Sequence, residues 1–492
     1  MAARVGDLSP GPMSPRRSSF ALLALLAVLA VLAVLAGAPA SAEEMAAVLP
    51  GALEGRPRSG EASPLQARVD AAPEGATVEV GPGTYTGDLF VDHAVRLVGR
   101  GRPRLLGSGS GSVVRIRAAD VTLEGFDIDG RRGGDLGRDS AGIHTSAPRT
   151  VLRDCRIVEA LFGIYLREAP GALVERCSIR GIAGREPGEK GSGIHVYATD
   201  GFTLKGNEIV DVRDGFYIQS SPNGYVAGNI ARDLRYGLHY MFSDDNVFED
   251  NLFENGAAGT AIMYSNRLRF RRNRFVHNRG FASVGLLFKT CDDVLAEDNL
   301  LADNARGIFL EGSSRDVFRR NVVAESDTAI VLYDSCSKVV FEGNSFVANL
   351  TPLTLVGKRT DTRFDGNYWS ENDEPDLDGD GRSDRPYRLS SVFDHMRGNM
   401  TAADLFAQGF AAAAMGAAER NFPVLELVSA RDLSPLARPP DLPAVPRHGG
   451  RGRAAHLPAL AGSASALGGG VLLLLSGRRP KGSAGGSHGE RA

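Results

Sequence analysis

The sequence predicts an all-β protein built as a single-stranded right-handed parallel β-helix, in which successive coils of the chain stack on one another. Two repeated columns and their period predict this fold. The first column is a three-residue phrase that returns throughout the region from about Ser140 to Trp369. The second is a column of asparagines, whose members are 22, 22, 22, 26, 22, 23 and 23 residues apart. A period near 22 residues is too short for repeats of two helices and fits one coil of a parallel β-helix.

The asparagine column is expected to face the interior. There each amide can bond to the amide of the next coil, as side-chain ladders do in other stacked β-structures. Cys155 and Cys177 are 22 residues apart and continue this column towards the N-terminus, so we expect two buried free thiols. Cys291 and Cys336 are expected two coils apart, about 10 Å, which is beyond disulfide reach. The members of the column are Asn207, Asn229, Asn251, Asn273, Asn299, Asn321, Asn344 and Asn367.

The first 63 residues precede the predicted coils. Residues 1–42 have the features of an export signal peptide, because an arginine pair precedes a long apolar run and Ala-Ser-Ala follows it. Residues 43–63 are expected to form a flexible leader. Apolar spacing from Leu65 to Ala72 predicts a short helix that covers the open end of the β-helix, which takes up residues 64–370. The net charge of −3 gives no reason to expect a nucleic-acid partner, because a protein that binds nucleic acid should show a basic stripe.

The third residue of each phrase is expected to point outward, because side chains of a strand alternate between its faces. Aligning the phrases on their middle residues predicts one outward column: His144, Tyr165, His195, Tyr217, His239, Met263, Leu287, Phe309 and Val331. The residues two positions later predict a second: Ser146, Arg167, Tyr197, Gln219, Met241, Ser265, Lys289, Glu311 and Tyr333. This alignment clusters His239, Met241 and Met263 on two adjacent coils, with His195 two coils away.

These side chains offer thioether and imidazole, the ligands that suit Cu(I). The chain has only 8 methionines and 9 histidines, yet two methionines and three histidines fall in the two columns. We therefore predict a copper site formed by His195, His239, Met241 and Met263, and we predict no catalytic residues. The alternative is that the outward histidines and aromatic residues only stack on one another. Zinc is disfavoured, because closely spaced Cys and His ligands are missing.

An aspartate-rich loop follows the last coil, in residues 371–390. It matches an EF-hand-type calcium loop at positions one, three, five, six and nine. Tyr387 stands at position twelve in place of the bidentate glutamate, so calcium would be held less rigidly. We expect bound calcium to order the exit from the coils; the alternative is a solvated acidic turn. The predicted calcium residues are Asp376, Asp378, Asp380, Arg382 and Asp384.

Residues 391–436 are expected to form a C-terminal helix and docking segment. His395, Met396 and Met400 make a reserve copper site there. A helix starting near Thr401 is expected to cap the coils or to dock on a membrane partner. Residues 437–492 are expected to form a disordered tail. Within it, residues 457–475 barely reach membrane-spanning length and are a candidate weak anchor.

Together with the export signal, the coils and the acidic loop, three phrases resemble the NosD family of periplasmic maturation proteins of nitrous oxide reductase. They are Gly237-Leu238-His239-Tyr240-Met241-Phe242-Ser243, Gly366-Asn367-Tyr368-Trp369 and Asn421-Phe422-Pro423-Val424-Leu425. The resemblance covers about residues 64–436. It implies a copper-handling role in the periplasm beside an ABC-type ATPase and permease at the inner membrane. It also implies a copper chaperone as donor and nitrous oxide reductase, with its copper–sulfur centre, as client.

Three functions of different classes follow. The favoured one is a non-enzymatic accessory protein that receives or relays Cu(I). The rival is a carbohydrate-active enzyme, a polysaccharide lyase, hydrolase or epimerase, which would need an acid/base pair or a carboxylate-bound metal in a groove. The predicted outward columns offer only Glu311 and Arg167 for such chemistry, far apart. A surface-binding solenoid without copper chemistry is the third reading.

Overall fold

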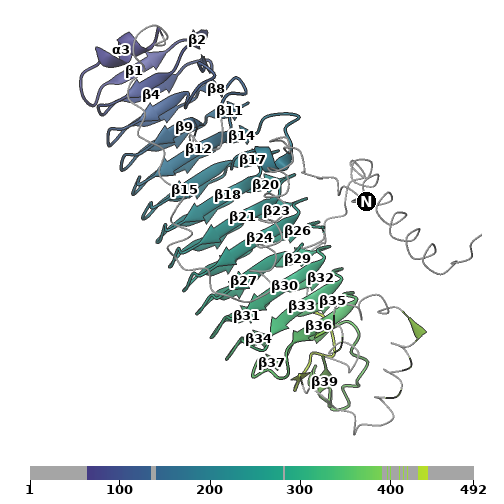
Figure 1. Cartoon of the computed structure of the whole chain (residues 1–492). Helices are drawn as coiled ribbons and strands as arrows, with labels where there is room; N and C mark the ends of the chain where they lie inside the picture. Colours follow the sequence, from purple (N-terminus) through teal and green to yellow (C-terminus); the bar gives the residue numbers. More distant parts are fainter. Residues whose placement is uncertain are drawn as a thin grey trace, which may run out of the picture. The chain divides into compact units, whose positions relative to one another are not determined.

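The computed structural model describes residues 64–134, 140–280, 283–389 and 430–440, with isolated positions between 396 and 418. Three β-sheets wind around one core, and each coil contributes one strand to each sheet. Figure 1 shows the coils following one another from α3 to β39. The predicted parallel β-helix is confirmed. The expected signal peptide, the leader at 43–63, and the tail from residue 441 onward with its candidate anchor at 457–475 lie outside the described residues.

The first sheet has fifteen strands, parallel to their neighbours except for the pair β39–β40. Its three-residue strands turn their middle residue into the core, as the burial of Leu152, Phe248 and Phe341 shows. In sheet order its strands are β1 Thr77–Val80, β4 Arg96–Gly99, β7 Thr122–Glu124, β10 Val151–Arg153, β13 Leu173–Glu175, β16 Thr203–Lys205, β19 Tyr225–Ala227, β22 Val247–Glu249, β25 Arg269–Arg271, β28 Leu295–Glu297, β31 Val317–Arg319, β34 Val340–Glu342, β37 Arg363–Asp365, β40 Arg431–Asp432 and β39 Tyr387–Arg388.

The second sheet has thirteen strands and adds a second row of inward apolar residues. Aromatic rings stack along this row near its C-terminal end, with Phe346 and Trp369 centred 4.1 Å apart. Its strands are β2 Thr84–Thr86, β5 Arg104–Leu106, β8 Asp127–Asp129, β11 Arg156–Val158, β14 Ser178–Arg180, β17 Glu208–Val210, β20 Ile230–Arg232, β23 Leu252–Glu254, β26 Arg274–Val276, β29 Leu300–Ala302, β32 Val322–Ala324, β35 Ser345–Val347 and β38 Tyr368–Trp369.

The third sheet has twelve strands, includes the longest strands and carries the repeated phrase. Ile164, Ile194 and Phe216 are fully buried, so the middle residue of the phrase faces the core as predicted. Its strands are β3 Leu89–Val91, β6 Val114–Ile116, β9 Ala141–Thr145, β12 Phe162–Arg167, β15 Ile194–Tyr197, β18 Asp214–Gln219, β21 Tyr236–Met241, β24 Ala258–Met263, β27 Leu286–Lys289, β30 Arg306–Glu311, β33 Thr328–Tyr333 and β36 Thr351–Val356.

A short helix closes the N-terminal end of the β-helix. At the start, α3 (Gln66–Asp70) buries Val69, and the Gln66 amide bonds to the backbone nitrogen and oxygen of Phe90. The predicted capping helix is therefore confirmed, with tighter bounds. A short 3₁₀-helix, η2 (Pro187–Glu189), lies in the loop between β14 and β15. None of the helices in the described ranges has the length and hydrophobicity that crossing a bilayer requires.

The asparagine ladder runs through the interior between the first and second sheets. In each coil the side-chain nitrogen of one asparagine donates to the side-chain oxygen of the next; for Asn229 and Asn251 the distance is 2.9 Å. The backbone nitrogen of Asn229 donates to the same oxygen at 3.0 Å. Cys177 extends the ladder, since its backbone nitrogen donates to Asn207 at 2.9 Å. The inward asparagine column is therefore as predicted.

The four cysteines are buried free thiols, as expected. Cys291 and Cys336 belong to a second interior ladder, made mostly of serines. Ser313 lies in the coil between them, because the Cys291 backbone nitrogen donates to its hydroxyl at 3.1 Å. The two-coil separation that excludes a disulfide is therefore present.

Asp432 ends the asparagine ladder from a distant part of the sequence. Its carboxylate accepts hydrogen bonds from the backbone nitrogens of Gly366 and Asn367 at 3.1 and 2.9 Å, and from the Asn367 amide at 2.8 Å. The indole nitrogen of Trp369 donates to it at 3.1 Å.

The expected helix near residues 401–413 falls almost wholly outside the described residues. The segment that the structure describes after it, residues 430–440, caps the coils with strand β40 instead.

Candidate functional site

The outer face of the third sheet carries a continuous stack of rings, as the phrase predicts. Strand pairing places His144, Tyr165, His195, Tyr217 and His239 opposite one another on successive strands. Ring centroids of neighbours are 5.0, 4.3, 4.4 and 4.8 Å apart in that order. We call these five residues the histidine column.

The column changes character at the next coil, and the predicted alignment is wrong there. His239 pairs with Ala261, and Met263 pairs with Met241 on one side and Lys289 on the other. The true copy of the phrase is Gly259-Thr260-Ala261, in which the buried Thr260 takes the inward position opposite Leu238. Its hydroxyl is bonded there, accepting a hydrogen bond from the Leu287 backbone nitrogen at 2.9 Å. The predicted alignment placed the apolar Ile262 at the inward position, because it assumed that the inward residue of each phrase is apolar.

With the observed register, His239, Met241 and Met263 still lie on two neighbouring strands. His239 and Met241 are alternate residues of β21, and Met263 sits beside Met241 on β24. Neighbouring strands are about 4.8 Å apart, so the two flexible thioether side chains lie side by side. His195 stays two strands from His239 and does not share its immediate surroundings, because Tyr217 lies between them, stacked on His195 and edge-on to His239. Met241 is 6% exposed, whereas His239 and Met263 are partly exposed.

Asp214, which the sequence reading missed, lies beneath His239. It begins β18, its carboxylate is fully buried, and one oxygen lies 3.5 Å from Nδ1 of His239. Two hydrogen bonds from Arg235, at 2.8 and 2.7 Å, hold the carboxylate in place. Burial alone would raise the pKa of Asp214, but His239 and Arg235 outweigh it and the pKa is lowered. The available signal was its position directly before the glycine of a phrase.

An anionic carboxylate beside Nδ1 is the arrangement that orients many metal-binding histidines. It favours the tautomer with the proton on Nδ1 and leaves Nε2 free for a metal ion. The donor set that results, one imidazole and two thioethers, suits a soft ion such as Cu(I). The residues of this site therefore fit copper chemically.

Three histidines of the histidine column carry a buried ring nitrogen without a hydrogen-bond partner: Nε2 of His144, Nδ1 of His195 and Nδ1 of His239. Burial, and secondarily the positive charge of Arg115, lowers the pKa of His144 to about 4. Burial, followed by Arg213, lowers the pKa of His195 to about 3. Both rings are therefore neutral near pH 7, the state in which imidazole can bind a metal.

The reserve copper residues lie elsewhere. His395 falls outside the described residues. Met396 is partly buried and Met400 is 54% exposed, with the backbone of Met400 bonded to that of Met396 at 2.8 Å. Between them, Asn399 accepts a hydrogen bond from the Gly357 backbone at 3.0 Å, just after β36. This segment is thus fixed four strands along the sheet from β24, and the structure does not join it to Met241 and Met263.

The acidic loop brings three of its predicted ligands together. Carboxylate oxygens of Asp376, Asp378 and Asp380 lie within 4.8 Å of one another. The side chain of Arg382 turns away to Ser434, whose carbonyl and hydroxyl oxygens accept its hydrogen bonds at 2.9 and 2.8 Å. Asp384 accepts a hydrogen bond from the Leu377 backbone nitrogen.

Residues 173–374 match the model of the NosD family, described as a periplasmic copper-binding protein. A curated protein of Pseudomonas aeruginosa, named probable ABC transporter binding protein NosD, is 30% identical over 135 residues, which cover 27% of this chain and 31% of that protein. A protein of the same name from Stutzerimonas stutzeri is 29% identical over 168 residues, covering 34% and 37%. The matched stretch thus spans about a third of the length of each curated relative.

Solved structures show the same fold at low identity. The A-module of the Azotobacter vinelandii mannuronan C-5 epimerase AlgE6 superposes with a TM-score of 0.54 at 16% identity, covering 62% of this chain and 93% of the module. The A-module of AlgE4 from the same organism gives 0.51 at 15% identity, with 61% and 94% covered. At this identity the likeness concerns the β-helix alone. His195, His239, Met241 and Met263 all lie within residues 173–374, the part of this chain that matches the NosD family model.

Proposed function

We propose that this chain is a periplasmic accessory protein that receives or relays Cu(I) during maturation of nitrous oxide reductase, and that it is not an enzyme. The observation that carries the proposal is the group His239, Met241 and Met263, placed on adjacent strands and backed by the Asp214 carboxylate. Two thioethers and one imidazole form a soft ligand set that suits Cu(I).

The copper description of the family supports the choice of metal, and the names of the relatives support an ABC transporter as partner. An ABC-type ATPase and permease at the inner membrane would work beside this chain, a copper chaperone would load it, and the copper–sulfur centre of the reductase would receive the cargo. Residues 1–42 would direct export to the periplasm.

The test replaces the three ligands while keeping the volume of the face. In the variant His239→Gln, Met241→Leu, Met263→Leu, we expect Cu(I) affinity, measured by competition with a chromophoric Cu(I) chelator, to fall by at least about tenfold. Copper content of the co-expressed reductase should fall with it. His144→Gln is the matched control, since it removes a histidine of the same column four strands from Met241 and five from Met263. Unchanged affinity and reductase copper content in the triple variant would refute the site.

The reserve residues His395, Met396 and Met400 remain a second proposed copper site. Met→Leu substitutions at 396 and 400 in the same assay would reveal it if copper binding persists in the triple variant.

We also propose that Asp376, Asp378 and Asp380 hold calcium, with Arg382 contributing through its backbone and Asp384 through its carboxylate. Its role would be to order the exit from the coils.

A carbohydrate-active enzyme is the alternative that the fold supports, and Asp214 with His239 and Tyr217 is the group that could serve it. Two features of that group disfavour acid/base chemistry. Asp214 is fully buried, and its bonds to Arg235 and its lowered pKa keep it ionised and occupied. Turnover of alginate or pectin by the purified chain would decide for the enzyme.

A further inference from the structure

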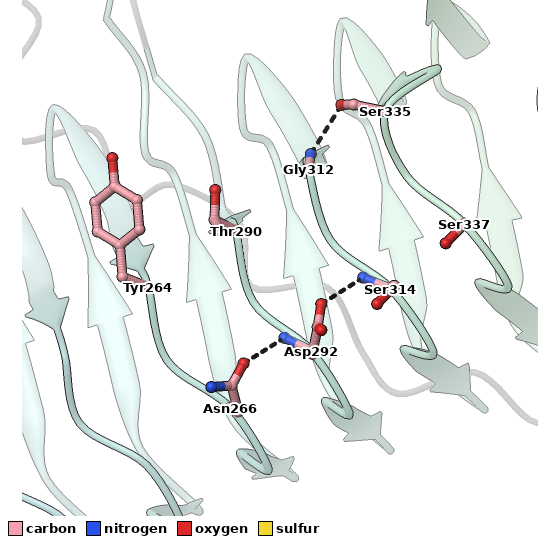
Figure 2. A pocket seen from close by; sticks show the side chains of 8 residues that line it. All are labelled: Tyr264, Asn266, Thr290, Asp292, Gly312, Ser314, Ser335 and Ser337. Carbon is pink, nitrogen blue, oxygen red and sulfur yellow. Dashed lines mark hydrogen bonds between the residues drawn. The ribbon is translucent and has the colours of Figure 1, made fainter. Parts of the chain in front are cut away.

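A hollow of about 470 Å³ lies on the outside of the coils, at the turn that leads from the third sheet to the first. Figure 2 shows its residues in two rows along successive coils. One row holds Tyr264, Thr290, Gly312 and Ser335, and the row beside it holds Asn266, Asp292, Ser314 and Ser337. None of these residues belongs to the proposed copper site.

The hollow exists because side-chain size drops sharply along one row. Phe242 and Tyr264 occupy the same turn position in consecutive coils and stack with their rings 5.2 Å apart and 8° from parallel. Each is 42% exposed. The next two coils offer only Thr290 and Gly312 at that position. One face of the Tyr264 ring is therefore covered by Phe242, and the other looks along the coils into the hollow.

The floor of the hollow supplies hydrogen-bonding groups that the protein itself leaves unused. The hydroxyl groups of Tyr264, Thr290 and Ser337 have no hydrogen-bond partner among the described residues. The Asp292 carboxylate accepts the Ser314 backbone nitrogen at 3.0 Å and faces Arg315 at 3.1 Å, yet its side chain is 38% exposed and can accept a further bond. A flat apolar face beside hydroxyl and carboxylate groups matches the two faces of a pyranose ring, one of C–H groups and a rim of hydroxyls.

Charge around the hollow selects among sugars. Four carboxylates, from Asp244, Asp245, Asp292 and Asp293, share only two arginines, Arg267 and Arg315. The local surplus of negative charge disfavours uronates and favours neutral or amino sugars. A volume near 470 Å³ falls in the range of small-ligand pockets and admits one or two sugar rings.

We propose that this hollow is a binding site for a neutral or amino pyranoside, which stacks on Tyr264 and hydrogen-bonds to Thr290 and Asp292. The site binds sugar without turning it over, because Asp292 is the single carboxylate among its lining residues and glycoside hydrolysis uses a pair. It would attach the solenoid to a glycan while the histidine column on the neighbouring face stays free.

The experiment titrates the N-acetylglucosamine trimer into the full chain and follows saturation-transfer NMR and calorimetry. We expect weak but saturable binding, lost by about tenfold in Tyr264→Ala and less strongly in Thr290→Val. Gly312→Tyr should abolish binding, since its side chain fills the hollow. Residues with side chains already adopt the left-handed backbone at this position, with φ of 52° at both Phe242 and Tyr264 and 63° at Gly312. The added Cβ at Gly312 lies 3.3 Å from the Thr290 hydroxyl, which can rotate away, and circular dichroism of Gly312→Tyr checks that the variant folds.

Ser220→Tyr is the matched control. It adds the same side chain to the same turn position, with φ of 51°, on the far side of Phe242 from the hollow. Binding that is unaffected by Ser220→Tyr and lost in Gly312→Tyr places the sugar in the hollow. Absence of trimer binding to the unsubstituted chain, or equal binding by both Tyr variants, overturns the proposal. Tighter binding of trimannuronate than of the trimer would overturn the choice of sugar class.

Discussion

The asparagine ladder inside the coils and the histidine column outside them are built on the same repeat, yet they treat polar groups in opposite ways. Inside, successive coils repeat one residue type, and each amide is bonded above and below, as for Asn229 and Asn251. Outside, the residue changes from coil to coil, and three buried ring nitrogens lack a partner. The repetition inside satisfies every ladder amide, whereas the variation outside leaves buried ring nitrogens without a hydrogen bond.

The sharpest way to test this contrast is to break one ladder position. Asn251→Ala removes an oxygen that accepts two hydrogen bonds from Asn229 and a nitrogen that donates to Val226. The Asn229 backbone nitrogen and the Val226 carbonyl then lose these buried bonds, and the Asn229 amide keeps only its bond to Leu204. We expect a loss of roughly 3 to 5 kcal/mol in the free energy of unfolding, by chemical denaturation. Arg272→Gln is the outer control, because it breaks an exposed ion pair with Asp250, and its midpoint should match that of the unsubstituted chain. Equal losses in both variants would end the distinction.

Asp316 is an interior position that departs from full bonding. One carboxylate oxygen accepts the Val294 backbone nitrogen at 2.9 Å, while Oδ2 is buried and unbonded. Burial raises the pKa of Asp316 to about 8. The unfolded chain ionises near pH 4, so stability should fall as pH rises from about 4 to about 8. Asp316→Asn should remove this slope and add on the order of 2 to 4 kcal/mol at pH 8. A slope that is unchanged in the variant would show that Asp316 is not its source.

His144 should give the opposite slope on the outer face. Burial lowers its pKa to about 4, below the value near 6.5 of the unfolded chain. The unfolded state therefore takes up the proton first, and stability should fall as pH drops from about 6.5 to about 4. His144→Phe keeps a ring in the stack and should flatten this acid limb, by roughly 1 to 3 kcal/mol at pH 4. Thermal unfolding across the pH range measures it, and a parallel decline in both proteins would contradict the assignment.

The smallest expected effect concerns the exit from the coils. The acidic loop is already held by backbone bonds, from Ser383 to Pro435 at 2.8 Å and from Ala437 to Gly381 at 3.0 Å. Calcium should therefore slow amide exchange in residues 376–387 and barely change the melting temperature, and a chelator should reverse the effect. Asp378→Asn should abolish the response, while Asp373→Asn, a neighbouring aspartate outside the motif, should keep it. The same calcium response in both variants would leave only a solvated acidic turn.

The positions of the His and Met side chains on the third sheet could have been placed from spacing alone. Counting 22 residues from His239 and Met241 gives Ala261 and Met263, the pairing that the strands show. Following apolar residues instead shifted this coil, because Thr260 faces inward and is satisfied by a hydrogen bond. Asp214 was passed over for a related reason. Its importance comes from His239 and Arg235 in the next coil, and neither lies beside it in sequence.

The sequence by itself determined the β-helix, the inward asparagines, the free cysteines and the outward His and Met side chains. Each follows from a period that any stacked coil must repeat, because equivalent residues then meet the same surroundings. Only the tertiary structure decided that Asp432 ends the ladder, that Asp214 backs His239, and that a hollow opens beside Tyr264. These depend on differences between neighbouring coils and on a segment that returns from 65 residues away. A repeated residue can be recognised in the sequence, but the neighbours of a residue that breaks the repeat are known only from the stacked coils.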